Sequence, residues 1–209
     1  MSDDFAWICD SLDFAYAPMS VEVPENLNVD SPVVAASGLH RTGLPYDETA
    51  FEAVAKWDKS PGGYAKTLPH VFKCNGFTGV SAKAREVFVA HDMGKASFRP
   101  LQLYEADGVR PYSGRLYLLN FGAQKQAFRG HDSPLLQRAF TRGDVRKLPF
   151  LEQRVEDQVV LDRKALTGAD LWTDPLLYRG VFVSDRLHDA MVRARVDKPF
   201  HLSRCVIAG

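Results

Sequence analysis

The feature that most constrains the fold of this chain is one sequence pattern that occurs twice. Residues 79–90 read GVSAKAREVFVA, and residues 180–194 read GVFVSDRLHDAMVRA. In both copies an apolar run ends at a serine, and further apolar residues follow that serine at offsets of three, six and seven. Such spacing places apolar side chains on one face of a helix, and the apolar segment that comes next indicates a returning strand. Each copy therefore predicts a strand–helix–strand unit of roughly 25 residues, either a compact β–α–β unit or a split form of one.

The serines that begin the two predicted helices, Ser81 and Ser184, are open to two interpretations. As caps, their hydroxyl oxygens accept hydrogen bonds from N–H groups of the first turn, and Asp185 places a negative charge where the helix dipole favours it. A helix N-terminus behind a serine can also bind an anion. Neither copy has the glycine-rich run that brings backbone close to a phosphate. We therefore interpret both serines as caps.

The first third of the chain has a weaker pattern. Residues 1–32 contain several prolines among Asn and Asp residues, which predicts an irregular arm with one strand near Phe5–Cys9. Residues 33–38, VVAASG, are predicted to form a strand that a glycine stops. Apolar residues recur at every third position in Asp47–Trp57, which predicts a short helix with acids in its first turn. The run SPGGYAK at 60–66 is predicted to be a flexible loop.

Strand signals become stronger beyond residue 70. Residues 71–80 are strand-like but interrupted by Asn75-Gly76, and the segment that follows the first helix predicts two strands at 98–105 and 114–121. The second of these is nearly all apolar, which indicates a central strand covered on both faces. The other predicted elements are a short helix that begins at Ser133-Pro134 and ends before Gly143, a strand near 155–161 with one helical turn after it, and a final strand–helix–strand segment from Trp172.

These elements together predict an α+β fold. We expect a mixed, mainly antiparallel sheet that carries two similar strand–helix–strand units, with the irregular N-terminal arm against it. Residues 1–66 would form this arm and its short helix, packed on a main domain at 67–209. A chain of 209 residues with 45% hydrophobic residues is long enough to bury the core of one such domain.

Charge and cysteine content narrow the range of partners and compartments. The 26 basic residues equal the 26 acidic residues, so the chain has no excess positive charge with which to bind nucleic acid or an anionic membrane. The N-terminus carries acids where a secretory signal carries bases, and no apolar run approaches the ~20 residues of a transmembrane helix. The three cysteines are scattered and form no CxxC pair, so neither a disulfide framework nor a cysteine zinc site is expected. We expect a cytoplasmic protein.

The sequence lacks the strong catalytic signatures. It contains no GxSxG, GxxxxGKS/T, HExxH or GxGxxG motif. The pairs His91-Asp92 and His131-Asp132 resemble the pair that metal-dependent phosphohydrolases use, but the further His and Asp ligands of such sites are not visible. His188 faces away from the apolar side of its helix and is expected to be a solvated surface residue. We therefore predict no catalytic, cofactor-binding or metal-binding residue. A metal-dependent hydrolase that uses a His-Asp pair is the alternative function.

Residues 171–179, LWTDPLLYR, combine Trp, Tyr and Arg in a stretch without regular periodicity. These residue types dominate the energetic hot spots of protein interfaces, so Trp172, Asp174, Tyr178 and Arg179 are candidate partner-binding residues. In the alternative interpretation, Trp172 anchors the loop in the core, because a Trp in a loop usually buries most of its ring. Asp174 would then cap a turn at the proline that follows it.

A second candidate binding surface is the predicted turn DGVRPYSG at residues 107–114. An inhibitor that occludes an active site needs a protruding acidic or aromatic surface, and a turn between two long strands can supply one. Arg110 and Tyr112 are the candidate contact residues of this turn.

The C-terminal part of the chain resembles a known family. The segment LWTDPLLYRGVFVSDRLHDAMVRARVDKPFHLSRCVI resembles the closing segment of immunity-protein family eleven of bacterial polymorphic-toxin systems. Members of this family have a Leu-Trp-Arg-Asp motif, then a glycine and a strand that ends in Val-Ser and an acid, and finally a helix and a strand. LYLLNF at 116–121 and VLDRKALTGADLW at 160–172 are similar to further family segments, so the resemblance covers roughly residues 68–207. Thr173 departs from the family's usual Arg, whereas the matching positions are Leu171, Trp172, Asp174, Gly180, Val183, Ser184 and Asp185.

This resemblance implies a small cytoplasmic protein that binds a cognate toxin domain and blocks it, without catalysis or a cofactor of its own. The family motifs are not a described active site, so no functional residue is transferred to this chain. The toxins neutralised differ within such families, so the resemblance does not identify the toxin. A third interpretation, from a different class, is a structural or oligomerising module, and the oligomeric state does not follow from the sequence.

Overall fold

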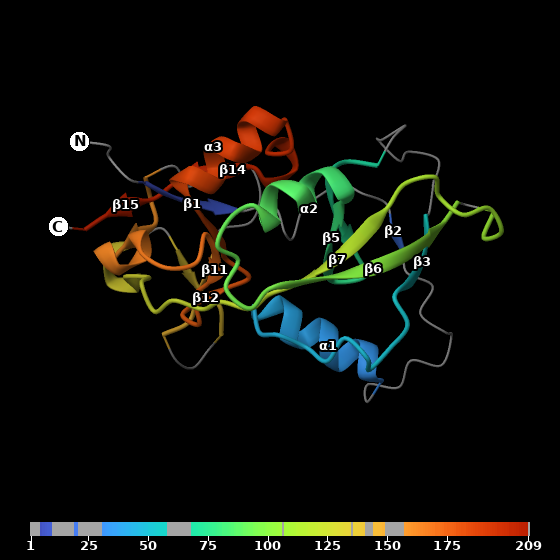
Figure 1. Cartoon of the computed structure of the whole chain (residues 1–209). Coiled ribbons are helices and arrows are strands. Elements are labelled where there is room, and N and C mark those ends of the chain that lie inside the picture. The colour runs from blue at the N-terminus through green and yellow to red at the C-terminus, as the bar shows by residue number, and fades with distance from the viewer. Residues whose placement is uncertain are drawn as a thin grey trace.

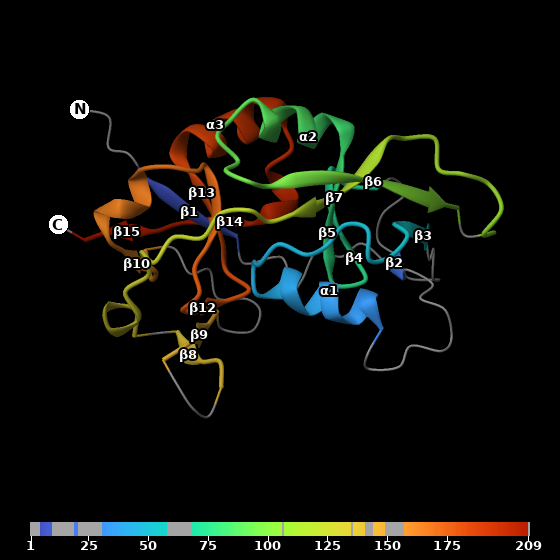
Figure 2. The same cartoon turned by 60° about the horizontal axis from the view of Figure 1, so that its bottom comes forward.

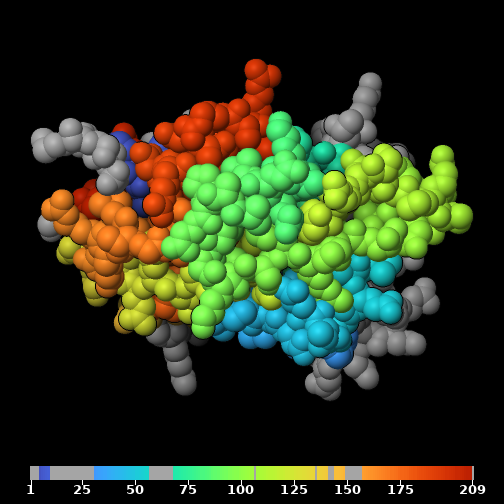
Figure 3. Space-filling view, viewed as in Figure 1, coloured from blue at the N-terminus to red at the C-terminus, as the bar shows by residue number. Residues whose placement is uncertain are grey.

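Two sheets lie side by side, and helices cover both faces of the larger one (Figure 1). The computed structural model describes residues 5–9, 19–20, 31–57, 68–105, 107–134, 136–140, 144–148 and 157–208. Helix α1 (Pro32–Arg41) lies on one face of the larger sheet, and α2 (Ala82–Val89) lies on the other (Figures 1 and 2). Helix α3 (Asp185–Ala194) lies beside α2, and the two form a continuous surface (Figure 3). Within the described ranges no helix is long and apolar enough to cross a membrane.

The larger sheet has six strands in the order β2-β3-β6-β7-β5-β4. Strands β3 and β6 pair in parallel, and the other neighbouring strands pair antiparallel. This mixed, mainly antiparallel sheet with its helices confirms the predicted α+β fold. The two strands predicted near 98–105 and 114–121 are also confirmed, and the second occupies the interior of the sheet as expected. The six strands are β2 (Met19–Ser20), β3 (Val54–Trp57), β4 (Val71–Cys74), β5 (Phe77–Ser81), β6 (Ser97–Tyr104) and β7 (Leu116–Asn120).

The smaller sheet has four strands in the order β11-β13-β1-β14, and all neighbours are antiparallel. Its strands are β1 (Ala6–Cys9), β11 (Leu171–Thr173), β13 (Val181–Ser184) and β14 (Leu202–Arg204). Further short strands form a two-stranded pair and a three-stranded sheet; these are β8 (Gln137–Arg138), β9 (Arg146–Lys147), β10 (Val160–Leu161), β12 (Leu177–Tyr178) and β15 (Val206–Ile207). Among the described residues, 3-10 helices span Gly130–Asp132, Arg163–Leu166 and Lys198–Phe200.

The two copies of the repeated sequence pattern form the same split β–α–β unit. In the first copy, β5 and β6 both pair antiparallel with β7, so they are parallel to each other and one strand apart, with α2 as their connection. In the second copy, β13 and β14 both pair antiparallel with β1, and α3 connects them. The predicted strand near Phe5–Cys9 is confirmed, but it is the middle strand of this unit. The boundary between residues 66 and 67 stays a prediction.

Serine caps begin both repeated helices, as predicted. The Ser81 Oγ accepts a hydrogen bond from the Ala84 N–H at 3.2 Å, and the Ser184 Oγ accepts one from the Leu187 N–H at 3.2 Å. The apolar faces of the two helices then meet in one core, where Phe88 packs edge to face against Phe200 with ring centroids 5.9 Å apart. The local pattern of cap and apolar stripe thus determines both units.

The predicted interruption at Asn75-Gly76 is a hairpin turn between β4 and β5. Both residues have positive φ, 46° for Asn75 and 88° for Gly76. Two such residues in succession match the right-handed twist of adjoining strands, and Asn-Gly is the sequence that adopts this turn most readily. The strand predicted over 71–80 is therefore a tight antiparallel pair.

Two predictions in the N-terminal third are wrong. The strand predicted at 33–38 is part of helix α1, whose first residue is a proline after the serine at its N-cap. Proline is well suited to a first helical position because it lacks the N–H that would stay unpaired there, and the two valines gave a misleading strand signal. The helix predicted at Asp47–Trp57 is absent, because Asp47 closes a turn through Thr49 and the chain then forms β3 beside β6.

The short helix predicted from Ser133-Pro134 is also wrong within the described residues. A 3-10 helix precedes this point, and β8 follows it. Ser133 is fully buried, and its hydroxyl donates to the Arg129 carbonyl and accepts from the Val160 N–H, so it bridges two segments instead of capping a helix. The predicted strand near 155–161 is confirmed at β10, and the helical turn after it is a 3-10 helix. The predicted loop at 60–66 lies outside the described residues.

Candidate partner-binding surface

Trp172, the first candidate contact residue, lies in β11 and is 1% exposed. Its ring stacks on Phe182 with a centroid separation of 5.6 Å and an interplanar angle of 10°. The Lys125 Nζ lies 3.6 Å from the centre of the Trp172 ring. Trp172 therefore anchors this segment in the core, and it supports a binding surface only by holding its neighbours in place.

Asp174 is also buried, at 1% exposure, and its carboxylate accepts hydrogen bonds from three backbone N–H groups. Its Oδ2 accepts hydrogen bonds from the backbone N–H groups of Ala127 at 2.7 Å and Phe128 at 2.8 Å. Its Oδ1 accepts from the Leu176 N–H at 2.9 Å, which closes the turn that leads into β12. The carboxylate thus caps the expected turn and also holds the strand-like segment before it.

Replacing Asp174 by alanine is expected to lower the free energy of unfolding by about 3 kcal/mol or more, since three backbone N–H groups lose a charged acceptor. Asp174→Asn, which keeps one acceptor oxygen, should lose less. Urea denaturation followed by circular dichroism measures both values. If Asp174→Ala is as stable as the wild type, the hydrogen bonds of the Asp174 carboxylate do not stabilise the fold.

The chain reaches the surface directly after Asp174. Leu176 is 41% exposed and Phe140 is 53% exposed, and the half-buried Tyr178 meets Phe140 edge to face with ring centroids 5.4 Å apart. The Arg179 guanidinium carbon lies 4.9 Å from the centre of the Tyr178 ring. We call Phe140, Leu176, Tyr178 and Arg179 the β12 patch.

A small three-stranded sheet supports the β12 patch. Strand β12 pairs in parallel with β9, and β9 pairs antiparallel with β8, which ends just before Phe140. Beside the patch, Leu176 also lines a groove of about 700 Å³ whose walls carry both basic and acidic residues. Sequence reasoning missed Phe140 and Leu176. Phe140 fell inside a helix that was predicted wrongly, and no local signal places it next to Tyr178.

The second candidate surface, around Arg110 and Tyr112, is a self-contained turn. Asp107 accepts hydrogen bonds from the backbone N–H groups of Val109 and Arg110 and from the Arg110 side chain. These hydrogen bonds hold the pKa of the Asp107 carboxyl well below its usual range. Arg110 is exposed, and Tyr112 is partly buried against the core. The turn lies at the far end of the β6–β7 pair, away from β12 (Figures 1 and 2), so the two surfaces are separate candidates.

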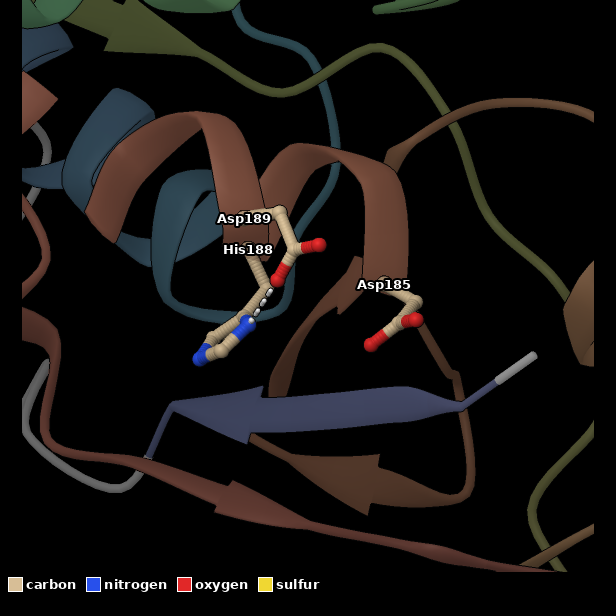
Figure 4. Close-up of side chains that lie close together, drawn as sticks. All are labelled: Asp185, His188 and Asp189. Atoms are coloured by element: carbon tan, nitrogen blue, oxygen red, sulfur yellow. Dashed lines mark hydrogen bonds and ion pairs between the residues drawn. The ribbon is translucent and has the colours of Figure 1, made fainter. Parts of the chain in front are cut away.

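One group in the described residues has metal-ligating side chains close together, Asp185, His188 and Asp189 on α3 (Figure 4). His188 stacks on Trp7 of β1 with ring centroids 3.7 Å apart, and the Trp7 Nε1 donates to the Asp185 Oδ1 at 2.9 Å. The prediction of a solvated His188 is wrong, because its side chain is 17% exposed and packs on this strand. These contacts fasten α3 to β1.

The two His-Asp pairs lie apart from this group. The His91 Nδ1 lies 2.8 Å from the Val87 carbonyl oxygen, and Asp92 accepts from the Gly94 N–H in the turn after α2. Asp132 forms an ion pair with Arg129. Within the described residues neither pair joins a cluster able to hold a metal ion, so the structure gives the hydrolase alternative no support.

Comparison with protein families decides what kind of protein this is. A family model described as immunity protein family (Imm11) matches residues 51–202, about three-quarters of the chain. The chain belongs to this family. No curated protein matches it. This assignment confirms the family resemblance of the C-terminal segment.

The Imm11 match includes both candidate surfaces and both repeated helices, but it begins after β1 and α1. Strand β1, an interior strand of the smaller sheet, is thus supplied by a segment of this Imm11 protein outside the matched region. The β12 patch and its supporting short strands lie entirely inside it.

Proposed function

We propose that this Imm11 protein neutralises a cognate bacterial toxin in the cytoplasm by stoichiometric binding, without catalysis of its own, and that the β12 patch contacts the toxin. The observation that carries the proposal is the exposed Phe140 ring beside the half-buried Tyr178 and Arg179, in a chain of an immunity-protein family. The toxin is the only macromolecular partner we propose, since balanced charge gives no support for nucleic acid or membrane binding.

The composition of the β12 patch fits a protein contact. Phe140 is 53% exposed, although burial of an aromatic ring against a partner is favourable in free energy. Tyr, Trp and Arg carry a disproportionate share of interface binding energy; Tyr178 lies directly beside Phe140, and Arg179 lies against the Tyr178 ring. The strands beneath hold these side chains in place before binding, which limits the entropy lost on association.

The test is co-expression with the toxin encoded by the adjacent gene. We expect the wild-type protein to relieve toxicity and to form a 1:1 complex. The double variant Phe140→Ala with Tyr178→Ala should weaken the complex by roughly 100-fold, because each hot-spot side chain contributes about 1–2 kcal/mol or more. Isothermal titration calorimetry measures the affinity, and the melting temperature verifies that the fold is intact.

The matched control is Val109→Ala with Arg110→Ala in the turn between β6 and β7, where both residues are exposed. This variant should bind like the wild type. If it loses binding while the β12 variant keeps it, the contact surface is that turn instead. Failure of the wild-type protein to bind or protect against any neighbouring toxin would contradict the proposed function itself.

A further inference from the structure

The outward side of helix α1 is apolar. The opposite side faces the larger sheet, and its buried residues are Ala36, Ser37 and His40. Helical spacing places another set of residues on the outward side, and these exposed positions are Val34, Ala35, Gly38 and Leu39. Among the described elements, no helix or strand covers this side (Figures 1 and 2). A helix that packs on a sheet usually carries charged or polar residues on its outward side, so α1 departs from the common pattern.

The other two helices follow the common pattern. Their exposed charged residues are Lys83 and Glu86 in α2, and Arg186, Asp189 and Arg193 in α3. In α1 the exposed charged residue is Arg41 in the last turn, and its guanidinium lies against Gly76 in the turn between β4 and β5. The outward side of α1 from Val34 to Leu39 therefore carries no charge.

The apolar surface continues past the end of α1. The Gly43 N–H donates to the His40 carbonyl at 2.9 Å, and the Leu44 N–H donates to the Leu39 carbonyl at 3.0 Å. This pair of hydrogen bonds is a Schellman motif, which brings the residue after the glycine back beside the last turn of the helix. Leu44 is 38% exposed and Leu39 is 40% exposed, so Leu44 extends the same surface. We call Val34, Ala35, Gly38, Leu39 and Leu44 the α1 face.

Gly38 lies in the centre of the α1 face, and nothing in the described part of the chain requires a glycine there. Its φ is not positive, and a Cβ atom at this position would meet no atom within 4 Å beyond its own helix backbone and chain neighbours. Glycine inside a helix is less favourable than alanine, because it loses more conformational freedom on folding. The missing side chain leaves a notch between Val34 and Leu39, where the backbone of a second helix can approach closely.

We propose that a second copy of this chain covers the α1 face, so that two α1 helices pack against each other across a twofold axis near Gly38. In such a contact the same surface lies on both copies, and a charge near the axis would face the same charge. The uncharged α1 face avoids this repulsion, whereas surfaces that bind a different protein are arranged with complementary charges. The chain has a net charge of zero, so two copies do not repel each other over long distances. This inference goes beyond the proposed function and does not depend on it.

The contact is small, so the dimer is expected to be weak. A helix of ten residues is about 15 Å long, and each copy therefore covers less than the ~800 Å² per partner of a standard interface. We expect a Kd of roughly 10–100 µM. The protein should then be mainly monomeric when dilute and mainly dimeric when concentrated.

Analytical ultracentrifugation of the wild-type protein, from about 5 to about 500 µM, tests the proposal. The average mass should rise from that of one chain, 23.3 kDa, toward twice this value. Leu39→Glu makes two like charges face each other and should raise the Kd about tenfold or more. The matched control is Val192→Glu, which introduces the same charge at a 44% exposed apolar position on α3 and should dimerise like the wild type.

Gly38→Gln distinguishes a lost contact from a damaged fold. Glutamine fills the notch, so the Kd should rise about tenfold or more. Its higher helix propensity should keep the melting temperature of the dilute protein at or above the wild-type value. Loss of the dimer in a variant of equal or greater stability cannot result from unfolding.

Disulfide cross-linking reports the geometry of the contact directly. Gly38→Cys should form a disulfide-linked dimer under mild oxidation, because this position lies close to its own copy at the twofold axis. Val192→Cys, on α3, should stay monomeric on a non-reducing gel. The native cysteines do not interfere, because Cys9, Cys74 and Cys205 are all buried.

A wild-type protein that stays monomeric at every concentration overturns the inference, and so does a dimer that persists in both Leu39→Glu and Gly38→Gln. If the wild type is monomeric and these variants weaken the toxin complex, the α1 face contacts the toxin; the dimer inference is then wrong and the proposed function stands. If no toxin complex forms but the wild type dimerises and both variants do not, only the proposed function is overturned.

Discussion

The variant Ile8→Asp is expected to prevent the chain from folding. Ile8 is 0% exposed in β1, an interior strand of the smaller sheet, where its cross-strand neighbours are Phe182 in β13 and Ser203 in β14. The change removes a buried apolar side chain and places an unpaired carboxylate in the same apolar cluster. Each effect costs several kcal/mol, and together they approach the total stability of about 5–15 kcal/mol that is typical of a domain.

The matched control is Ile8→Val, which shortens the same side chain by one methylene group and should cost only about 1 kcal/mol. Far-ultraviolet circular dichroism and denaturant titration distinguish the two outcomes. A cooperative, wild-type-like transition in Ile8→Asp would show that β1 does not occupy the middle of the sheet. This result would be notable because β1 lies outside the segment that matches the Imm11 family.

The second large effect is expected for Trp172→Ala. Loss of a 1% exposed ring that stacks on Phe182 leaves a cavity between β11 and β13, and such truncations cost about 3–5 kcal/mol. For a chain of this length, we expect the melting temperature to fall by roughly 10 °C or more. Tyr178→Ala, at a half-buried position of the β12 patch, should cost clearly less, about 1 kcal/mol.

Toxin binding separates the roles of these two aromatic residues. At a temperature where Trp172→Ala is still folded, we expect its affinity for the toxin to stay near the wild-type value, whereas Tyr178→Ala should weaken binding. Calorimetric titration at low temperature, with the folded fraction measured by circular dichroism, provides this comparison. A folded Trp172→Ala variant that binds no toxin would contradict this separation of roles, because the buried Trp172 ring would then be needed for binding as well as for stability.

Elements that depend on local spacing were predicted well. The serine caps and apolar stripes of α2 and α3 need only residues within two turns of each other, because cap hydrogen bonds and helix faces are local. The same holds for the Asn75-Gly76 turn, where the identity of two residues sets the backbone conformation. Helix α1 was missed although its buried residues Ala36, Ser37 and His40 follow helical spacing, because the strand propensity of two valines was given more weight.

The candidate site was predicted only in part. The sequence pointed to the stretch from Trp172 to Arg179 through its residue types, but it did not distinguish the buried half from the exposed half. Phe140 joins Tyr178 through the pairing of short strands β8, β9 and β12. Composition and periodicity do not predict which segments that are distant in the sequence will pack against each other.

The sequence by itself determined that this protein contains two strand–helix–strand units, each begun by a serine cap, and that its C-terminal segment resembles an immunity-protein family. Only the tertiary structure decided which strand lies in the middle of each unit, β7 in one and the N-terminal β1 in the other. It also decided that Trp172 and Asp174 are buried while Phe140 and Leu176 are exposed. The physical reason is the separation along the sequence of the residues that interact. Capping and helical periodicity act between near neighbours in the chain, whereas strand partners and burial are set by the free energy of packing segments that are distant in sequence.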